Sequence, residues 1–163
     1  MEKYRINETF YSLQGEGRNT GRAAVFVRFS GCNLKCPFCD TDFTKYQEMS
    51  AQDIIDSMKA LIGDVSTMPM VVLTGGEPTL QQNLPELTKA IQDLGLGVIS
   101  FTGHLYEQVQ EQLEGCDMVL DGAFEETKLE TKRKILGSTN QRILCLTDRY
   151  KNCVDWFLTP STK

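Results

Sequence analysis

Short apolar runs alternate with stretches of helical periodicity along this chain. Residues 23–30 (AAVFVRFS) form a run rich in β-branched and aromatic residues, which predicts a buried strand. Residues 70–74 (MVVLT) form a second run, and the glycine pair that follows it marks the end of the strand. Further strands are predicted at residues 98–101, 116–120 and 143–146, and a sixth at 156–158.

Helical patterns fill the intervals between these runs. Ser50 has the character of an N-cap, and Asp53, three residues later, partly completes a capping box. Apolar positions then recur at helical spacing, at Ile54, Ile55, Met58, Leu61 and Ile62. Helices are also predicted at residues 82–94 and 105–114. Strands that alternate with helices indicate βαβ units, so the predicted fold class is α/β with a parallel sheet.

Composition narrows the functional classes. With 163 residues and neither an internal repeat nor a linker, the chain is expected to form a single domain over residues 1–163. The N-terminus has no apolar h-region, and no run approaches the ~20 apolar residues that span a bilayer, which predicts a cytoplasmic protein without a membrane partner. The net charge of −5 disfavours a nucleic-acid partner, because phosphate binding needs concentrated Lys and Arg.

The cysteines change this picture, because three of the six lie together. Cys32, Cys36 and Cys39 have the spacing C-x3-C-x2-C in a loop directly after the strand at 23–30. Three thiolates can hold three irons of a 4Fe–4S cluster. The fourth iron is then open to a substrate or cofactor, unless Cys116, Cys145 or Cys153 supplies its ligand. A zinc site with a distant fourth ligand is the alternative, although zinc usually takes paired ligand spacings. The remaining residues, Cys116, Cys145 and Cys153, have no metal spacing and are predicted to be ordinary, partly buried thiols.

Polar and glycine-rich segments follow several of the predicted strands. Besides the cysteine loop, they are Gly75 to Pro78 (GGEP), Thr102-Gly103 and Asp121-Gly122. Because parallel strands end at one edge of a sheet, where ligands gather, we expect these segments to share a site. Gly75 and Gly76 allow a ligand to approach the backbone closely, and Glu77 offers acceptors for an ammonium group. A simple strand-to-helix turn with Pro78 at the first helical position is the alternative.

The cysteine spacing after an apolar strand, the aromatic Phe38 and the GGEP turn together resemble the radical S-adenosylmethionine (SAM) superfamily. The resemblance implies a partial (β/α)6 barrel, a 4Fe–4S cluster on the three cysteines, and SAM chelating the open iron. The reduced cluster would cleave SAM to methionine and a 5′-deoxyadenosyl radical. Phe38 would pack near the adenine, and Gly75, Gly76 and Glu77 would bind the amino group. Ser100 and Thr102 would contact the ribose or carboxylate, with an ordinary loop hydroxyl as the alternative for each.

The N-terminal half is similar to 7-carboxy-7-deazaguanine synthases, through residues 8–17 (ETFYSLQGEG), 25–29 (VFVRF) and 39–43 (CDTDF). These enzymes contract the ring of 6-carboxy-5,6,7,8-tetrahydropterin on the route to deazapurines such as queuosine. The resemblance implies that Gln14, Glu16 and Arg28 bind the pterin, and that Thr41 ligates Mg²⁺ beside the substrate carboxylate. A guanidinium pairs bidentately with a carboxylate, and oxygen ligands suit Mg²⁺. Backbone support or plain solvent exposure is the alternative role for each residue.

The C-terminal half is similar to activating proteins of anaerobic ribonucleotide reductases, through residues 101–107 (FTGHLYE), 117–124 (DMVLDGAF) and 137–142 (GSTNQR). Those proteins abstract a hydrogen atom from a glycine of a partner, the glycyl-radical enzyme. The leading hypothesis is a synthase-like radical SAM lyase, because the residues expected to touch the substrate lie in the N-terminal half. A glycyl-radical activase is the alternative, and a non-catalytic iron–sulfur or zinc protein is the alternative of another class.

Either radical SAM enzyme would need further partners. The cluster would be reduced by an electron donor such as flavodoxin. A partial barrel also leaves one side open, which a bound substrate, a partner protein or a second copy in a homodimer would close.

Overall fold

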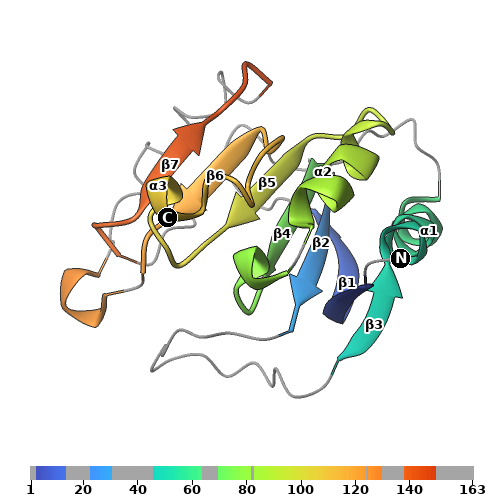
Figure 1. Cartoon of the computed structure of the whole chain (residues 1–163), viewed down its shortest axis with the longest axis horizontal. Helices are drawn as coiled ribbons and strands as arrows, with labels where there is room; N and C mark the ends of the chain where they lie inside the picture. The colour runs from blue at the N-terminus through green and yellow to red at the C-terminus, as the bar shows by residue number, and fades with distance from the viewer. Residues whose placement is uncertain are drawn as a thin grey trace.

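The structure, a computed structural model, describes residues 3–13, 23–30, 46–63, 70–81, 83–123, 125–129 and 138–149. Within these residues a seven-stranded mixed sheet has the order β3-β1-β2-β4-β5-β6-β7 (Figure 1). Its strands are β1 (Lys3–Leu13), β2 (Ala23–Phe29), β3 (Gln47–Ser50), β4 (Met70–Gly75), β5 (Val98–Phe101), β6 (Met118–Asp121) and β7 (Arg142–Cys145).

The centre of the sheet is parallel, and its two flanks are antiparallel. β2, β4, β5 and β6 pair in parallel, as successive βαβ units require. On one flank β1 pairs antiparallel with both β2 and β3, and on the other β7 pairs antiparallel with β6. The four parallel strands therefore have their carboxyl ends at a shared edge.

Among the described residues, three α-helices accompany the sheet: α1 (Ala51–Ile62), α2 (Leu84–Gln92) and α3 (Tyr106–Val109). The predicted capping box at the start of α1 is confirmed, because the Ser50 side chain accepts from the Asp53 N–H and the Asp53 side chain accepts from the Ser50 N–H. α3 is shorter than the predicted helix at 105–114. The residues after Val109 form turns that lead to Gly115. Two short 3-10 helices, η3 (Pro78–Leu80) and η4 (Glu126–Lys128), follow β4 and β6.

Each face of the sheet carries its own apolar cluster, because side chains alternate along a strand. On one face the strands pack against the apolar sides of α1 and α2, and buried members include Val27, Leu73, Met58 and Leu87. The second face carries a smaller cluster, formed by Ala24, Met70, Val72, Ile99, Met118 and Leu120, which Phe26, Phe101, Ile143 and Cys145 extend. The two helices thus cover one face of the parallel strands.

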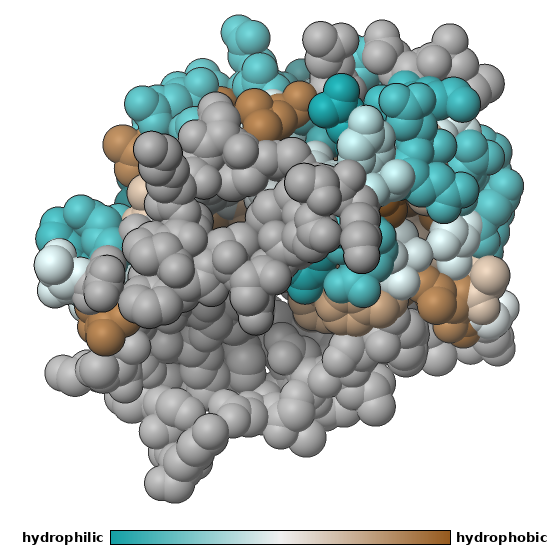
Figure 2. Space-filling view, turned by 90° about the horizontal axis from the view of Figure 1, so that it is seen from below, coloured by the Kyte–Doolittle hydropathy of each residue, from teal (hydrophilic) through white to brown (hydrophobic). Residues whose placement is uncertain are grey.

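Viewed from below, the side toward which the β2 arrow points in Figure 1, the described surface is mostly hydrophilic. Hydrophobic residues form small, separate groups on this side (Figure 2). Among the residues that the structure describes, no helix is both long and apolar enough to cross a membrane.

The predicted α/β class is confirmed, and the strands predicted at 23–30, 70–74, 98–101 and 116–120 correspond to the parallel centre. The strand predicted at 143–146 corresponds to β7, but it runs antiparallel to its neighbour. β1 and β3 were not predicted as strands, although Tyr4 and Ile6 are buried while Lys3 and Arg5 are exposed, the alternation of a strand with one covered face. The strand predicted at 156–158 lies outside the described residues.

Candidate active site

Part of the site expected from the sequence falls in the described part of the chain. The cluster ligands, the adenine contact, two pterin contacts and the Mg²⁺ ligand lie outside it: Cys32, Cys36, Cys39, Phe38, Gln14, Glu16 and Thr41. The structure places the other predicted residues: Arg28, Gly75, Gly76, Glu77, Ser100 and Thr102. These six residues belong to the turn predicted to bind SAM and to one predicted substrate contact.

The segments predicted to share a site do follow neighbouring parallel strands. β2 ends at Phe29, β4 at Gly75, β5 at Phe101 and β6 at Asp121. Phe29 pairs directly with Gly75, and Phe101 pairs with Leu120 one residue before the end of β6. The GGEP turn, Thr102-Gly103 and Asp121-Gly122 therefore lie along one edge of the sheet, as expected for a ligand site in a parallel sheet.

Gly75 brings the GGEP turn into direct contact with the end of β2. Its φ is +116°, and a Cβ at this position would lie 2.4 Å from both the N and the O of Phe29 and 2.8 Å from the Cγ of Arg28. The next glycine donates its N–H to the Phe29 carbonyl at 2.9 Å. Only glycine fits such a position, because a side chain would meet backbone atoms that cannot move aside. The turn is therefore fixed against the strand that precedes the cysteine segment in the sequence.

Glu77 is buried at this edge, with 1% of its surface exposed. Its Oε2 accepts from the N–H of Thr79 at 3.1 Å, from the Thr79 hydroxyl, and from the Thr102 hydroxyl at 2.8 Å. Its Oε1 accepts from the N–H of Gly103 at 2.7 Å. The carboxylate thus ties the turn after β4 to the loop after β5. Oε1 has a single donor among the described residues and keeps acceptor capacity for one more.

No cationic side chain of the described residues pairs with Glu77, whose four donors are all neutral hydroxyl or backbone N–H groups. A buried carboxylate is normally compensated by a charge or a metal, because removing an unpaired charge from water is costly. The donor set therefore leaves a net negative charge at the strand edge. That property fits a ligand with a positive charge.

The two hydroxyls predicted to contact a cofactor differ in their surroundings. Thr102 donates to Glu77 and accepts from the N–H of His104 at 3.1 Å, so its hydroxyl already has a partner on each side. Ser100 is fully buried within β5 and donates to the Phe101 carbonyl at 3.2 Å. The structure thus brings Thr102 to the GGEP turn, whereas it leaves Ser100 inside the sheet.

Arg28 lies on β2 beside the GGEP turn and is directed by neighbours from β1. Its Nε donates to the Glu8 carboxylate at 3.0 Å, and its guanidinium carbon lies 5.9 Å from the centre of the Phe10 ring. Phe10 in turn stacks on Phe26, with ring centres 4.9 Å apart and planes 6° apart. The side chain of Arg28 is 26% exposed, and Glu8 is exposed. A substrate carboxylate can therefore replace Glu8 on this guanidinium without opening the core.

Asp121 and Arg142 form a second polar cluster, and their ion pair was not predicted from the sequence. The fully buried carboxylate of Asp121 accepts from the Arg142 guanidinium, at 3.0 Å from Nε, and from the N–H of Tyr106 at 2.7 Å. Arg142 also donates to both oxygens of Glu107. These bonds raise the pKa of Arg142, with Asp121 as the largest cause, and they lower the pKa of Glu107.

Amide side chains join the same two segments. Gln141 donates to the Gly122 carbonyl at 2.9 Å, and Asn140 donates to the Ala123 carbonyl at 2.8 Å. The segments at 117–124 and 137–142, which carry part of the resemblance to reductase activating proteins, thus hold β6 and β7 together. Thr102 and Gly103, from the 101–107 segment of the same resemblance, contact Glu77 instead.

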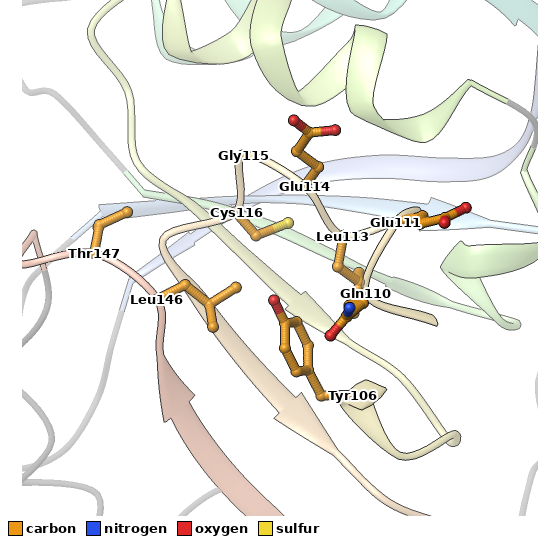
Figure 3. Close-up of a pocket in the computed structure, with 9 residues that line it drawn as sticks. All are labelled: Tyr106, Gln110, Glu111, Leu113, Glu114, Gly115, Cys116, Leu146 and Thr147. Atoms are coloured by element: carbon orange, nitrogen blue, oxygen red, sulfur yellow. The ribbon is translucent and has the colours of Figure 1, made fainter. Parts of the chain in front are cut away.

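A separate hollow of about 450 Å³ lies toward the amino end of β6 (Figure 3). Its lining includes Tyr106, Leu113, Cys116 and Leu146, and the ring of Tyr106 points into the space between the others. Burial raises the pKa of the Cys116 thiol to about 12, so this thiol is neutral at ordinary pH. The prediction of an ordinary thiol is in keeping with this. Tyr106 links the hollow to the carboxyl edge of the sheet, because its N–H donates to Asp121 at the end of β6.

Comparisons with known proteins agree with the cysteine motif. Residues 13–144 match the family described as "4Fe-4S single cluster domain". The chain is 55% identical over 78 residues to the 7-carboxy-7-deazaguanine synthase of Bacteroides thetaiotaomicron, an alignment that covers 47% of this chain and 39% of the relative. It is 34% identical over 180 residues to the synthase of Burkholderia multivorans, which covers 95% of this chain and 80% of the relative.

Among solved structures, the crystal structure of QueE from Escherichia coli is similar, with a TM-score of 0.50 and 30% sequence identity. The match covers 62% of this chain and 52% of that chain. The chain spans less than half the length of several synthases that it matches, including those of B. thetaiotaomicron and Neisseria meningitidis. The predicted iron–sulfur class and the predicted resemblance to the synthases are confirmed. The chain belongs to the 4Fe-4S single cluster domain family and, with the B. multivorans relative aligned over most of its length, to the family of the 7-carboxy-7-deazaguanine synthases.

Proposed function

We propose that this chain is a radical SAM enzyme that converts 6-carboxy-5,6,7,8-tetrahydropterin to 7-carboxy-7-deazaguanine with a 4Fe–4S cluster, SAM and Mg²⁺. The observation that carries the proposal is the buried carboxylate of Glu77, whose donors among the described residues are all neutral and which lies on a turn packed against Phe29. Phe29 precedes Cys32 by three positions in the sequence. A site for a cation thus adjoins the start of the cysteine motif.

The described residues fit SAM. This cofactor carries an ammonium and a sulfonium group, and Oε1 of Glu77 retains acceptor capacity beside Gly103. The glycine pair holds the turn close to β2, so its backbone is fixed without a bound ligand. When bound, the cluster on Cys32, Cys36 and Cys39 and the SAM beside it would supply the radical that removes a hydrogen atom from the substrate. Glu77 would bind the amino group, and Thr102 would hold Glu77.

Arg28 would bind the carboxylate of the pterin. A bidentate guanidinium–carboxylate pair fixes both position and orientation, and the contact with Phe10 already directs the guanidinium. Gln14 and Glu16 would bind the remainder of the pterin, and Thr41 would ligate Mg²⁺ beside the substrate carboxylate. We also propose a cytoplasmic location, reduction by an electron donor such as flavodoxin, and closure of the open side by the substrate or by a second copy of the chain.

The test uses the full chain, reconstituted anaerobically with iron and sulfide and supplied with dithionite, SAM, Mg²⁺ and the pterin. We expect 5′-deoxyadenosine and the deazaguanine product, both measured by mass spectrometry. Cys36→Ala should abolish both products, whereas Cys145→Ala, the same change outside the motif, should retain them. A chain that binds iron and sulfide but forms no 5′-deoxyadenosine contradicts the radical SAM assignment.

Arg28→Ala separates substrate binding from SAM cleavage. We expect the KM for the pterin to rise by about 10-fold or more, since one charge-assisted pair is lost, while SAM cleavage without substrate continues. Equal loss of both activities would contradict the role of Arg28. If the wild type cleaves SAM, leaves the pterin unchanged and instead produces a glycyl radical on an added anaerobic ribonucleotide reductase, detected by electron paramagnetic resonance, the activase replaces the synthase.

A further inference from the structure

Gln81 connects three separate parts of the site region through one buried amide. Its Oε1 accepts from the backbone N–H of Arg5 at 3.0 Å, and its Nε2 donates to the backbone carbonyl of Ser30 at 3.1 Å. Ser30 also donates its N–H to the Arg5 carbonyl at 2.8 Å. The amide therefore completes a closed set of hydrogen bonds between β1, the end of β2 and the segment after the GGEP turn.

The position of this bridge relates it to the cysteine segment. Ser30 is the first residue after β2, it is buried, and in the sequence it precedes Cys32 by two positions. Gln81 itself is only 7% exposed, so its bonds do not compete with bulk water. The bond to the Ser30 carbonyl fixes the plane of the peptide through which the chain leaves the sheet.

Gln81 and Glu77 flank one short, rigid element. The 3-10 helix η3 lies between them, and its hydrogen bonds join Leu80 to Glu77 and Gln81 to Pro78 at 3.0 Å each. One end of this element is tied through Glu77 to the loop after β5, and the other is tied through Gln81 to the exit from β2. This 3-10 helix therefore connects the GGEP turn to the end of β2, after which the cysteine segment follows in the sequence.

We propose that Gln81 is a positioning residue for the cluster: its amide holds the Ser30 peptide so that the cysteine segment starts in the direction that cluster binding requires. This inference rests on the proposed function, because it assumes that Cys32, Cys36 and Cys39 hold the cluster. Residues behind metal ligands orient those ligands, and their loss typically lowers metal affinity or activity by about 10-fold to 100-fold. Gln81 would act in this way through the backbone.

The chain offers a matched control. Gln141 makes the same kind of bridge at the other end of the sheet, where its side chain accepts from the Ser138 N–H at 3.0 Å and donates to the Gly122 carbonyl at 2.9 Å. Met is close to Gln in shape and lacks the amide, so Gln81→Met and Gln141→Met remove equivalent bonds. Gln81→Glu keeps an acceptor for Arg5 but places a carboxylate against the Ser30 carbonyl.

The experiment reconstitutes the wild type and the three variants anaerobically and measures iron per chain, the rate of cluster loss to an iron chelator, and the melting temperature of each apoprotein. We expect Gln81→Met and Gln81→Glu to lose the cluster about 10-fold faster than the wild type, and Gln141→Met to lose it at about the wild-type rate. We expect both Met variants to melt below the wild type by similar amounts, because each loses one bridge. The melting curves also show whether each variant folds. If Gln81→Met does not fold, Gln81→Glu, which is nearly identical in shape to the native residue, takes its place in the test.

The outcomes separate the two proposals. A wild type that binds no iron overturns the proposed function and this inference with it. A wild type that holds the cluster while both Gln81 variants lose it at the wild-type rate overturns this inference alone. Gln81→Glu that behaves as the wild type while Gln81→Met does not also overturns it, since the bond to Arg5 would then suffice. Equal acceleration in Gln141→Met reduces the effect to general stability and overturns the positioning role.

Discussion

Two buried carboxylates at the carboxyl edge of the sheet are held in opposite ways. Asp121, at the end of β6, is paired with the guanidinium of Arg142. Glu77, after β4, accepts hydrogen bonds from hydroxyl and backbone N–H groups only, as far as the described residues go. Both residues are about 1% exposed, so the difference lies in charge compensation and not in access to water.

This difference separates a structural acid from one suited to a ligand. The charge of Asp121 is neutralised within the fold, and its bonds secure the hairpin of β6 and β7. No described side chain compensates the charge of Glu77, and a buried carboxylate without a positive partner costs stability. A cationic ligand would therefore gain from Glu77 the charge pairing that Asp121 already makes with Arg142.

The largest expected effect comes from the glycine with positive φ that lies within two residues of each acid, Gly75 for Glu77 and Gly122 for Asp121. At Gly75 a Cβ would meet the Phe29 backbone at 2.4 Å, whereas at Gly122, where φ is +103°, its nearest contact is an ordinary 3.4 Å. Gly75→Ala should therefore lower the free energy of unfolding by about 3 kcal/mol or more, and Gly122→Ala by about 1–2 kcal/mol from backbone strain alone. Urea denaturation of the apoproteins measures both. Equal losses would show that the two turns are equally crowded.

Removing each charge tests the comparison directly. Glu77→Gln should weaken SAM binding by about 10-fold, because a charge-assisted bond to the ligand is lost, while the apoprotein stays as stable or gains stability. Asp121→Asn should leave SAM affinity unchanged and destabilise the fold by about 2 kcal/mol, a value reduced because Arg142 is 40% exposed. SAM affinity is read from the change that SAM causes in the spectrum of the reduced cluster. If Asp121→Asn weakened SAM binding and Glu77→Gln only destabilised the fold, Asp121 would be the ligand-binding acid and Glu77 the structural one.

The hydroxyl of Thr102 offers a smaller test of how Glu77 is held. Thr102→Val keeps the shape but removes one donor to the buried carboxylate, so the free energy of unfolding should fall by about 1 kcal/mol. Thr102→Ser restores the donor and should recover most of that loss. Thermal denaturation of the three proteins provides the comparison, and a Val variant as stable as the wild type would argue that this bond contributes nothing.

The smallest expected effect is a pH dependence of the melting temperature, and it concerns Glu107, which shares Arg142 with Asp121. Hydrogen bonds from Arg142 lower the pKa of the exposed Glu107 below its ordinary value of 4.5. A carboxyl with a lowered folded-state pKa contributes stability above its unfolded pKa and loses that contribution as the pH falls through the folded pKa. The difference in melting temperature between wild type and Glu107→Gln should thus be present at neutral pH and vanish well below 4.5. A difference that grows on acidification would contradict the pairing.

Much of the edge could be predicted from the sequence, because apolar runs locate buried strands and parallel strands end together. This is why the GGEP turn, Thr102 and Asp121 were expected near one another, and the structure places them along one edge. The capping box of Ser50 and Asp53 was also predictable, since it depends only on residues three positions apart.

Other features depend on contacts between distant segments and have no local signal. The hydrogen bonds of Gln81 require β1 to lie beside β2, and a single glutamine in the sequence does not predict this strand pairing. The direction of the four-residue strand β7 is set by its pairing with β6, not by its composition. The neutral surroundings of Glu77 likewise arise from residues on two different loops. Sequence patterns locate such residues at an edge but do not say which groups meet there.

The parallel pairing of β2 with β4 has a consequence for how the protein matures. It joins Ala24 to Met70, and the residues between them include all three clustered cysteines. This loop closes only when two distant strands meet, an event that is slow compared with local helix formation. During synthesis the cysteines emerge before β4 and the GGEP turn. A nascent chain that has not reached Gly75 therefore contains all three cysteines of the motif before the turn that carries Glu77 has been synthesised.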